Sequence, residues 1–427
     1  MRARNALRLL LIVLAGTLAL PLVVSLLALR GPATVSRAAD SGLAVVATVA
    51  VGSGPQGVAV NPSTNRVYVT DYLSSGNVSV IDGASNTVVA TVAVGSEPYG
   101  VAVNPNTNLI YVTDYLSSGN VFVIDGASNT VVTLVDVYAG GCGGGVAVNP
   151  NTNLIYVTAP CSTGYPGDYI NPLISVIDGV SNTVVATIEL GYEPTDVAVN
   201  PNTNRIYVAN GNTVSVIDGA SNTVVATVAV GRDPRGVAVN PNTNRVYVSD
   251  YLSSGNVSVI DGASNTVVAT VAIGNSPFGV AVNPSRDRIY VANTWGGNVS
   301  VIDGASNTVV ATVAVGRETQ GVAVNPNTNR IYVANRNDST VSVIEDTPTI
   351  DTPTPTPADT FTPMPTPTRP PGVGGAVLLP PAAITAEAGG TSGSSSQTVA
   401  TWIILGGTVA GALAMGGWYV RSRRRVG

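Results

Sequence analysis

A segment of roughly 43 residues recurs seven times between residues 43 and 346, and this repetition limits the possible folds more than any other feature. Each copy carries VAVNP, then a YVT, YVA or YVS segment, then VSVIDG or a variant, and all copies but the last end in SNTVVATVAVG or a close relative. The Asn of VAVNP stands at positions 61, 104, 149, 200, 240, 283 and 325. A near-constant period with four short apolar runs per unit indicates a radial or solenoidal array rather than separate globular domains.

The apolar runs have the composition of β-strands. They are rich in Val, Ile, Tyr and Thr, which suit a pleated and buried surface. The segments NPNTN and DGASN between them supply the Asn, Asp, Pro and Gly that tight antiparallel turns require. Four strands per unit and seven units predict an all-β fold, a seven-bladed β-propeller of four-stranded antiparallel blades over residues 43–346.

The two ends of the array indicate how the ring closes. The phrase VVATVAVG stands alone at 45–52, before the first repeat, and the last repeat stops at Ile344 without it. Seven blades need 28 strands, and the run from Gly57 to Ile344 supplies 27. We therefore predict that strand 44–51 pairs with 340–345 and completes the last blade, which leaves no large open edge.

Three segments carry a family resemblance. NPNTNRIYVAN (200–210), NPSRDRIYVAN (283–293) and NPNTNRIYVAN (325–335) resemble the YVTN-family β-propeller repeat, and the likeness extends over seven consecutive copies. In four units another residue replaces the final Asn: Asp71, Asp114, Ala159 and Asp250. The resemblance implies the propeller fold and a frequent location on bacterial or archaeal surfaces, but no single activity.

The N-terminal segment is typical of secretion. Arg2, Arg4 and Arg8 precede the uncharged, apolar stretch Leu9–Leu29, and small residues follow as far as Ala38. This pattern predicts a signal peptide over 1–38, with cleavage after Ala38. The apolar stretch is also long enough to span a bilayer, so an uncleaved anchor is the alternative.

The C-terminal segment predicts a tether and a membrane anchor. Residues 347–397 are rich in Thr and Pro and then in Gly and Ser, which favours an extended extracellular stalk. The uncharged run 399–420 has the length of a transmembrane helix, and the Arg-rich tail 421–427 should stay in the cytoplasm. We expect a single-pass protein of the cell membrane with its propeller outside.

Composition excludes several kinds of chemistry. The chain has no His, so it cannot form a Ser-His-Asp or Cys-His unit or bind a metal through imidazole. Residues 41–346 hold 10 Arg against 21 Asp and Glu, which argues against a nucleic-acid partner. The Asp of IDG recurs in six units and predicts a turn rather than a ring of acids. We expect no enzyme activity and no cofactor.

A binding function is the remaining expectation. The loops that join second to third strands, and one blade to the next, vary between units and should share one face of the disc, where binding usually resides. The candidate side chains on this face are aromatic or basic: Tyr72, Tyr99, Tyr115, Tyr192, Tyr251, Phe278, Trp295, Arg232, Arg235, Arg317 and Arg336. They suggest an adhesion scaffold for a protein or carbohydrate of the cell envelope. A surface-coat component without a ligand is the alternative, and an extracytoplasmic enzyme is the third.

The two cysteines fall in the same irregular unit. If the hairpin centres on NPNTN at 149–153, facing residues have numbers that sum to about 303, and Cys142 then faces Cys161. Neighbouring antiparallel strands bring such a pair within disulfide reach, and the compartment outside the membrane permits oxidation. We predict a disulfide between Cys142 and Cys161, with two free thiols as the alternative.

Overall fold

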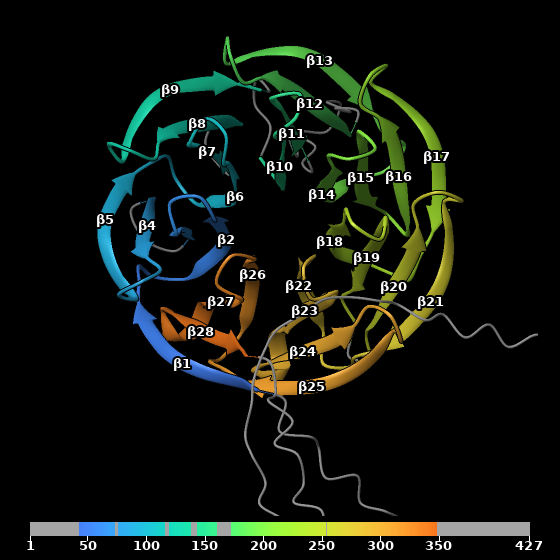
Figure 1. Ribbon diagram of the computed structural model, residues 1–427. Coiled ribbons are helices and arrows are strands. Elements are labelled where there is room, and N and C mark those ends of the chain that lie inside the picture. Colours follow the sequence, from blue (N-terminus) through green and yellow to red (C-terminus); the bar gives the residue numbers. More distant parts are fainter. Residues whose placement is uncertain are drawn as a thin grey trace, which may run out of the picture. The chain divides into compact units, whose positions relative to one another are not determined.

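The computed structural model describes residues 42–72, 76–115, 119–137, 143–159, 172–252 and 254–347. The chain divides into the units Met1–Thr354 and Pro355–Gly427, and every described residue belongs to the first. Seven four-stranded antiparallel sheets surround a central axis in this unit (Figure 1). The seven-bladed propeller predicted from the repeat is confirmed.

Blades one to six each take four consecutive strands, from the axis outward. The strands of blades one and two are β2 (Pro55–Asn61), β3 (Arg66–Asp71), β4 (Asn77–Asp82), β5 (Thr87–Ala93), β6 (Pro98–Asn104), β7 (Leu109–Asp114), β8 (Asn120–Asp125) and β9 (Thr130–Asp136). Those of blades three and four are β10 (Val146–Asn149), β11 (Leu154–Ala159), β12 (Leu173–Asp178), β13 (Thr183–Glu189), β14 (Pro194–Asn200), β15 (Arg205–Asn210), β16 (Thr213–Asp218) and β17 (Thr223–Ala229). Those of blades five and six are β18 (Pro234–Asn240), β19 (Arg245–Asp250), β20 (Asn256–Asp261), β21 (Thr266–Ala272), β22 (Pro277–Asn283), β23 (Arg288–Asn293), β24 (Asn298–Asp303) and β25 (Thr308–Ala314), with the 3₁₀ turn η1 (Thr294–Gly296).

Blade seven joins the two ends of the array. It contains β26 (Thr319–Asn325), β27 (Arg330–Asn335), the 3₁₀ turn η2 (Arg336–Asp338) and β28 (Thr340–Asp346). Its outermost strand is β1 (Leu43–Ala50), which runs antiparallel to β28 from the pair Leu43–Asp346 to the pair Ala50–Thr340. The predicted closing strand is therefore confirmed.

The hydrophobic core lies between neighbouring blades. The two middle strands of each blade are buried on both faces, which explains why their sequences show no polar stripe. Each of the seven core clusters contains one fully buried Tyr and draws side chains from two adjacent blades. The cluster between blades seven and one includes Val49 of β1, so the closing strand also contributes to the core.

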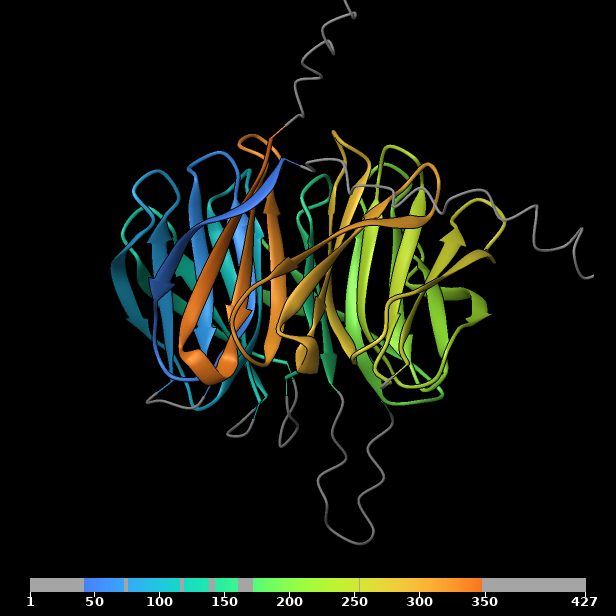
Figure 2. The same cartoon turned by 90° about the horizontal axis from the view of Figure 1, so that it is seen from below.

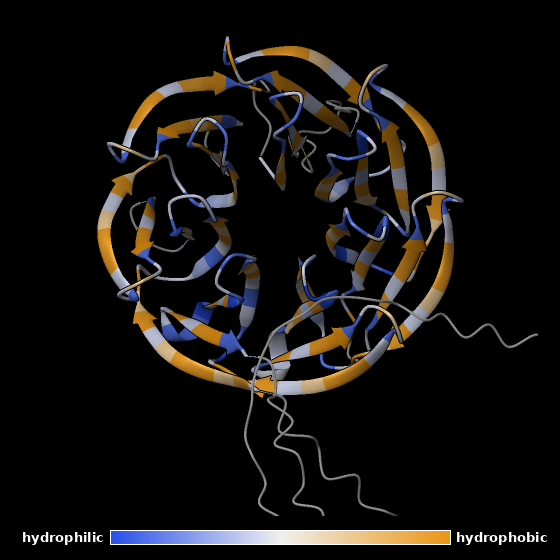
Figure 3. Ribbon diagram, in the orientation of Figure 1, coloured by the Kyte–Doolittle hydropathy of each residue, from blue (hydrophilic) through white to orange (hydrophobic). Residues whose placement is uncertain are grey.

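The outer strands form an apolar rim around the disc (Figure 3). Figure 2 shows the disc edge-on. Free sheet edges invite pairing with other chains unless a bulge or charge interrupts them. Each outer strand has such an irregularity at the second Val of its VV pair. In blade one, Val80 faces Ala90 while Ile81 faces Val88. The residue skipped is Val89, which is 49% exposed. The half-exposed valines of the rim are thus bulge residues that interrupt the free edges.

The NPNTN turns are uniform because they join the blades to one another. In every blade the Asn that ends the innermost strand is buried and donates its side-chain N–H to a turn residue of the next blade, as Asn61 does to Asn108 Oδ1 at 2.7 Å. The seven bonds form a closed ring, whose last member joins Asn325 to Asn65 Oδ1 at 2.8 Å. The accepting residues have positive φ, a conformation that Asn tolerates.

The bond that closes this ring gives a testable prediction. Replacing Asn65 by Gly keeps a residue that tolerates positive φ but leaves the buried amide of Asn325 without its acceptor. We expect Asn65→Gly to lower the free energy of unfolding by about 1–3 kcal/mol. Asn86→Gly is the matched control, because Asn86 also has positive φ but its Oδ1 has no partner among the described residues. Equal losses in urea denaturation of the two variants would contradict the role of the ring.

Several predictions concern residues outside the described ranges. The signal peptide 1–38, the stalk from 348 onward, the helix 399–420 and the tail 421–427 all lie there, as do Cys142 and Cys161. The anchor and the disulfide therefore stay predictions. Within the part of the chain that the structure describes, no helix has the length and hydrophobicity needed to span a membrane.

Candidate binding site at the channel mouth

The variable loops gather on one face of the disc. The backbone N–H that follows the second strand of a blade donates to the connector that leads into the same blade, as Tyr72 does to Gly54 O at 3.1 Å. Tyr115 bonds Glu97 O at 3.2 Å, and Arg336 bonds Glu318 O at 3.1 Å. The two kinds of variable loop therefore lie together, as the connectivity predicts.

Three of these connectors hold an acidic residue in the left-handed region. Glu97, Asp233 and Glu318 have φ of 52°, 51° and 54°. Such conformations are uncommon outside Gly, Asn and Asp, and they gather at sites where the surroundings impose them. The carboxylates of Asp233 and Glu318 pair with Arg235 at 3.0 Å and with Arg336 at 3.7 Å. The pKa of Tyr72 is raised by its burial and by a hydrogen bond with Glu97. The connectors thus position charged partners against the aromatic residues.

A pocket of about 340 Å³ opens at the centre of this face, and we call it the mouth pocket. Every blade contributes to its wall. The lining residues are Gln56, Tyr72, Tyr99, Tyr115, Gly144, Thr195, Arg235, Tyr251, Phe278, Glu318, Gln320 and Arg336. Such a concave site with aromatic walls and a few polar groups is typical of a ligand pocket.

The aromatic rings of the mouth pocket form two groups. Tyr72, Tyr99 and Tyr115 are mutual neighbours with ring centroids 5.6–6.4 Å apart. Tyr251 packs edge-on against Phe278 at 5.9 Å. The guanidinium groups lie over these rings, with Arg336 at 5.1 Å from Tyr72 and Arg235 at 5.7 Å from Tyr251. The three rings therefore form a contiguous cluster, with planes inclined by 30–73° to one another, beside two cations.

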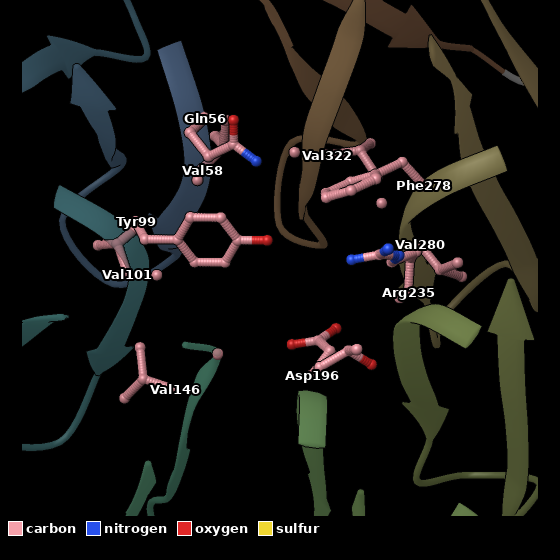
Figure 4. A pocket seen from close by; sticks show the side chains of 17 residues that line it. Gln56, Val58, Tyr99, Val101, Val146, Asp196, Arg235, Phe278, Val280 and Val322 are labelled. Carbon is pink, nitrogen blue, oxygen red and sulfur yellow. The ribbon is translucent and has the colours of Figure 1, made fainter. Parts of the chain in front are cut away.

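A smaller cavity of about 140 Å³, the channel cavity, lies on the propeller axis among the innermost strands (Figure 4). Its polar groups come from the first residues of these strands. Tyr99, Asp196 and Arg235 project into this space from different blades (Figure 4). Gln56 lies beside them and donates to Gln320 Oε1 at 3.3 Å. The cavity thus presents acceptors and donors to the same small volume.

Asp196 breaks the repeat at the wall of this cavity. The other six blades have Gly at the equivalent position: Gly57, Gly100, Gly145, Gly236, Gly279 and Gly321. Gly is needed there because the next blade approaches closely; a Cβ at Gly57 would lie 2.5 Å from the carbonyl oxygen of Tyr99. The Asp196 carboxylate instead accepts a hydrogen bond from the Val237 N–H of blade five at 3.0 Å. Burial raises the pKa of Asp196 to about 7.

The acids of the IDG segments have a structural role on the opposite face. Asp82 Oδ1 accepts hydrogen bonds from the N–H groups of Ala84 at 3.0 Å and Ser85 at 2.8 Å. These bonds, led by that from Ser85, lower the pKa of Asp82. The turn predicted for this Asp is confirmed. Among the described side chains, no group of three or more acids or thiols is placed to hold a metal ion.

The structure brings together seven of the eleven candidates chosen from the sequence: Tyr72, Tyr99, Tyr115, Tyr251, Phe278, Arg235 and Arg336. Tyr192 and Trp295 are 63% and 68% exposed and lie outside both cavities, as do Arg232 and Arg317. Sequence reasoning missed Gln56, Thr195, Asp196 and Gln320. The signal that could have found Gln56, Thr195 and Gln320 is the position after the strand-initial Pro or Thr, which differs in almost every blade, and Asp196 is the one exception to Gly at the next position.

Comparisons with known proteins concern the fold. No protein-family model matches the sequence, and the search of curated proteins gives no match. Among solved structures, the chain is similar to a chain of Kuenenia stuttgartiensis hydrazine synthase, with a TM-score of 0.59 and 20% identity. The similarity covers 68% of this chain and 95% of that chain. At such identity the likeness shows the propeller fold alone, so the YVTN resemblance stays a prediction from the sequence.

Proposed function

We propose that this protein binds a glycan of the cell envelope at the mouth pocket and acts by binding rather than by catalysis. The observation that carries the proposal is the aromatic surface of Tyr72, Tyr99 and Tyr115 beside Arg235 and Arg336 in one concave site. The apolar faces of sugar rings stack on aromatic rings, while their hydroxyl groups need nearby donors and acceptors. Both requirements are met in this pocket.

The spacing of the rings favours a sugar over a quaternary ammonium group. An aromatic cage must leave room for the cation between its rings, and each ring then lies within about 6 Å of the charge. Here the three rings contact one another, with centroids at 5.6–6.4 Å. Tyr99 and Tyr115, whose ring planes are only 30° apart, offer the flattest part of this group to a sugar ring, whereas an ammonium group finds no enclosed place.

The proposal includes a location. The predicted signal peptide, stalk and helix 399–420 would hold the propeller outside the cell membrane, where envelope glycans are accessible. A protein of the envelope is the alternative ligand, since aromatic and Arg side chains also anchor protein interfaces. A coat component without a ligand would assemble with itself and would not need the mouth pocket.

Substitution of the aromatic surface tests the proposal. The full-length protein is applied to an array of envelope oligosaccharides, and the affinity for the strongest linear binder is then measured by calorimetry. We expect Tyr72→Ala combined with Tyr115→Ala to weaken binding by roughly 100-fold, since loss of a stacking anchor costs about 2 kcal/mol or more. Tyr192→Ala is the matched control, because this exposed Tyr lies outside the pocket.

Three outcomes of this experiment are informative. Binding that weakens in the double variant and is unchanged in Tyr192→Ala supports the assignment. Equal affinities for all three proteins would place the site elsewhere. Absence of any glycan binding by the wild-type protein would overturn the proposed function, and saturable binding of an envelope protein would then favour the alternative ligand.

A further inference from the structure

Asp196 departs from the repeat: its carboxylate accepts a hydrogen bond from the next blade, whereas the other six blades dock without such a bond. Six blades meet their neighbours through Gly at this position, so the fold does not require a carboxylate there. Asp196 nevertheless lines the channel cavity (Figure 4). One carboxylate oxygen accepts the Val237 N–H, a bond that orients the group while an ionised carboxylate can still accept further donors.

The groups around Asp196 complement those of a sugar. Each hydroxyl of a vicinal diol both donates and accepts a hydrogen bond, so it needs an acceptor and a donor within reach. In the channel cavity Asp196 is the acceptor, Arg235 is a charged donor, and Tyr99 and Gln56 provide further polar atoms (Figure 4). The ring of Phe278 forms part of the wall. A single sugar residue could be bound through its hydroxyl groups and one apolar face.

The shape of the two cavities indicates which part of a glycan enters. The channel cavity has a volume of about 140 Å³, less than half the 340 Å³ of the mouth pocket. Tyr99, Arg235 and Phe278 line both, so the two spaces adjoin. The narrow inner space takes less of the ligand than the wide outer one. An end of a chain fits this arrangement, whereas the middle of a chain would have to cross the mouth without entering.

We infer that the channel cavity is a subsite for the terminal sugar residue of the glycan, and that Asp196 is the residue that recognises its hydroxyl groups. This inference rests on the proposed function and adds the direction of binding to it. The chain end lies on the axis beside Asp196, and the preceding residues stack on Tyr72, Tyr99 and Tyr115. The protein thereby selects ends of glycan chains, with a preference for neutral residues that present a vicinal diol.

The charge state of Asp196 should control this recognition. The other charged or titratable side chains that line the channel cavity are Tyr99 on β6 and Arg235 on β18. Burial raises the pKa of Tyr99 to about 12, and a guanidinium stays protonated, so neither changes charge between pH 6 and 8. The pKa of Asp196, raised to about 7 by burial, falls in that interval. The affinity should therefore decrease as the pH falls from 8 to 6.

Two substitutions of Asp196 test the inference in the full-length protein. Asp196→Gly restores the residue found in the other six blades and is expected to fold, while Asp196→Asn keeps the shape and removes the charge. The probe is the strongest linear binder of the oligosaccharide array. We expect both variants to bind it at least roughly tenfold more weakly at pH 8 and to lose the dependence on pH, because a charged hydrogen bond contributes about 1.5–3 kcal/mol. The melting temperature of each variant is measured in parallel, and a value no lower than that of the wild-type protein shows that the fold is intact.

The outcomes separate this inference from the proposed function. If the Tyr72 and Tyr115 variant loses binding while both Asp196 variants retain wild-type affinity, the terminal subsite is wrong and the mouth pocket stands. A wild-type affinity that is constant between pH 6 and 8 would overturn the role of the carboxylate. Absence of glycan binding by the wild-type protein would overturn both.

Discussion

Deletion of residues 43–50 from the full-length chain is expected to abolish cooperative folding of the propeller. The deletion removes β1, its seven backbone pairings with β28, and the buried Val49 from the core between blades seven and one. Burial of one Val contributes about 2 kcal/mol, and each backbone hydrogen bond contributes about 1 kcal/mol. Their sum is comparable with the whole stability of many domains. The exposed edge of β28 would also promote aggregation.

The control for this deletion removes the same number of residues from the Thr/Pro segment, at 351–358, outside the described structure. Thermal unfolding of both proteins is followed by circular dichroism. A chain without β1 that melts within a few degrees of the control would contradict the closing role of the strand.

The second large effect concerns two buried acids that stand where three other blades have Asn. In blade seven Asn335 accepts the Gly316 N–H at 3.1 Å and donates to Ser342 Oγ at 2.9 Å. Asp71 and Asp250 occupy the equivalent place and are 1% and 2% exposed. One carboxyl oxygen of each has no hydrogen-bond partner among the described residues. Burial raises the pKa of both groups to about 6.

These acids should make the propeller less stable at neutral pH than at pH 4. Their pKa is near 4 in the unfolded chain and about 6 in the folded one, so the native state binds more protons between these values. The contribution of these two acids to stability then falls as the pH rises through this interval and stays constant above it. A shift of two pH units corresponds to about 3 kcal/mol for each group.

The double substitution Asp71→Asn and Asp250→Asn is expected to remove this loss. Urea denaturation should show a gain of several kcal/mol at pH 7.5 and little change at pH 4. Asp82→Asn is the control of opposite sign, since the Asp82 carboxylate accepts N–H groups of its turn and its pKa is lowered. A double variant with the same gain at both pH values would show that desolvation of the charged form is not the cause.

The fold could be predicted because each blade repeats the same local information. The orphan phrase at 45–52 and the count of 27 strands from Gly57 to Ile344 together determined how the ring closes. The first strand of blade three, Val146–Asn149, is shorter than its counterparts, and YAGGCGGG before it gave some sign of this. The ring of Asn side chains was not predicted, because it joins residues that are more than 40 positions apart and depends on the docking of one blade on the next.

The sequence predicted on which face of the disc the site lies, but not which side chains of that face form it. Variation between loops correctly gathered Tyr72, Tyr115, Tyr251 and Arg336, which begin the loops after the second strands. It could not distinguish side chains that point to the axis from those that point to solvent, so Tyr192 and Trp295 were included as well. Asp196 was missed because a single Asp is unremarkable until six Gly residues are aligned with it and shown to line one cavity.

The central claim is that a glycan binds at the channel mouth with its end on the axis. The most direct measurement is a crystal structure of the protein with the strongest linear oligosaccharide from the array. We predict density for sugar rings over Tyr72, Tyr99 and Tyr115, with the terminal residue hydrogen-bonded to Asp196. Sugar density confined to the opposite face, over the DGASN turns, or to the outer rim would contradict the claim.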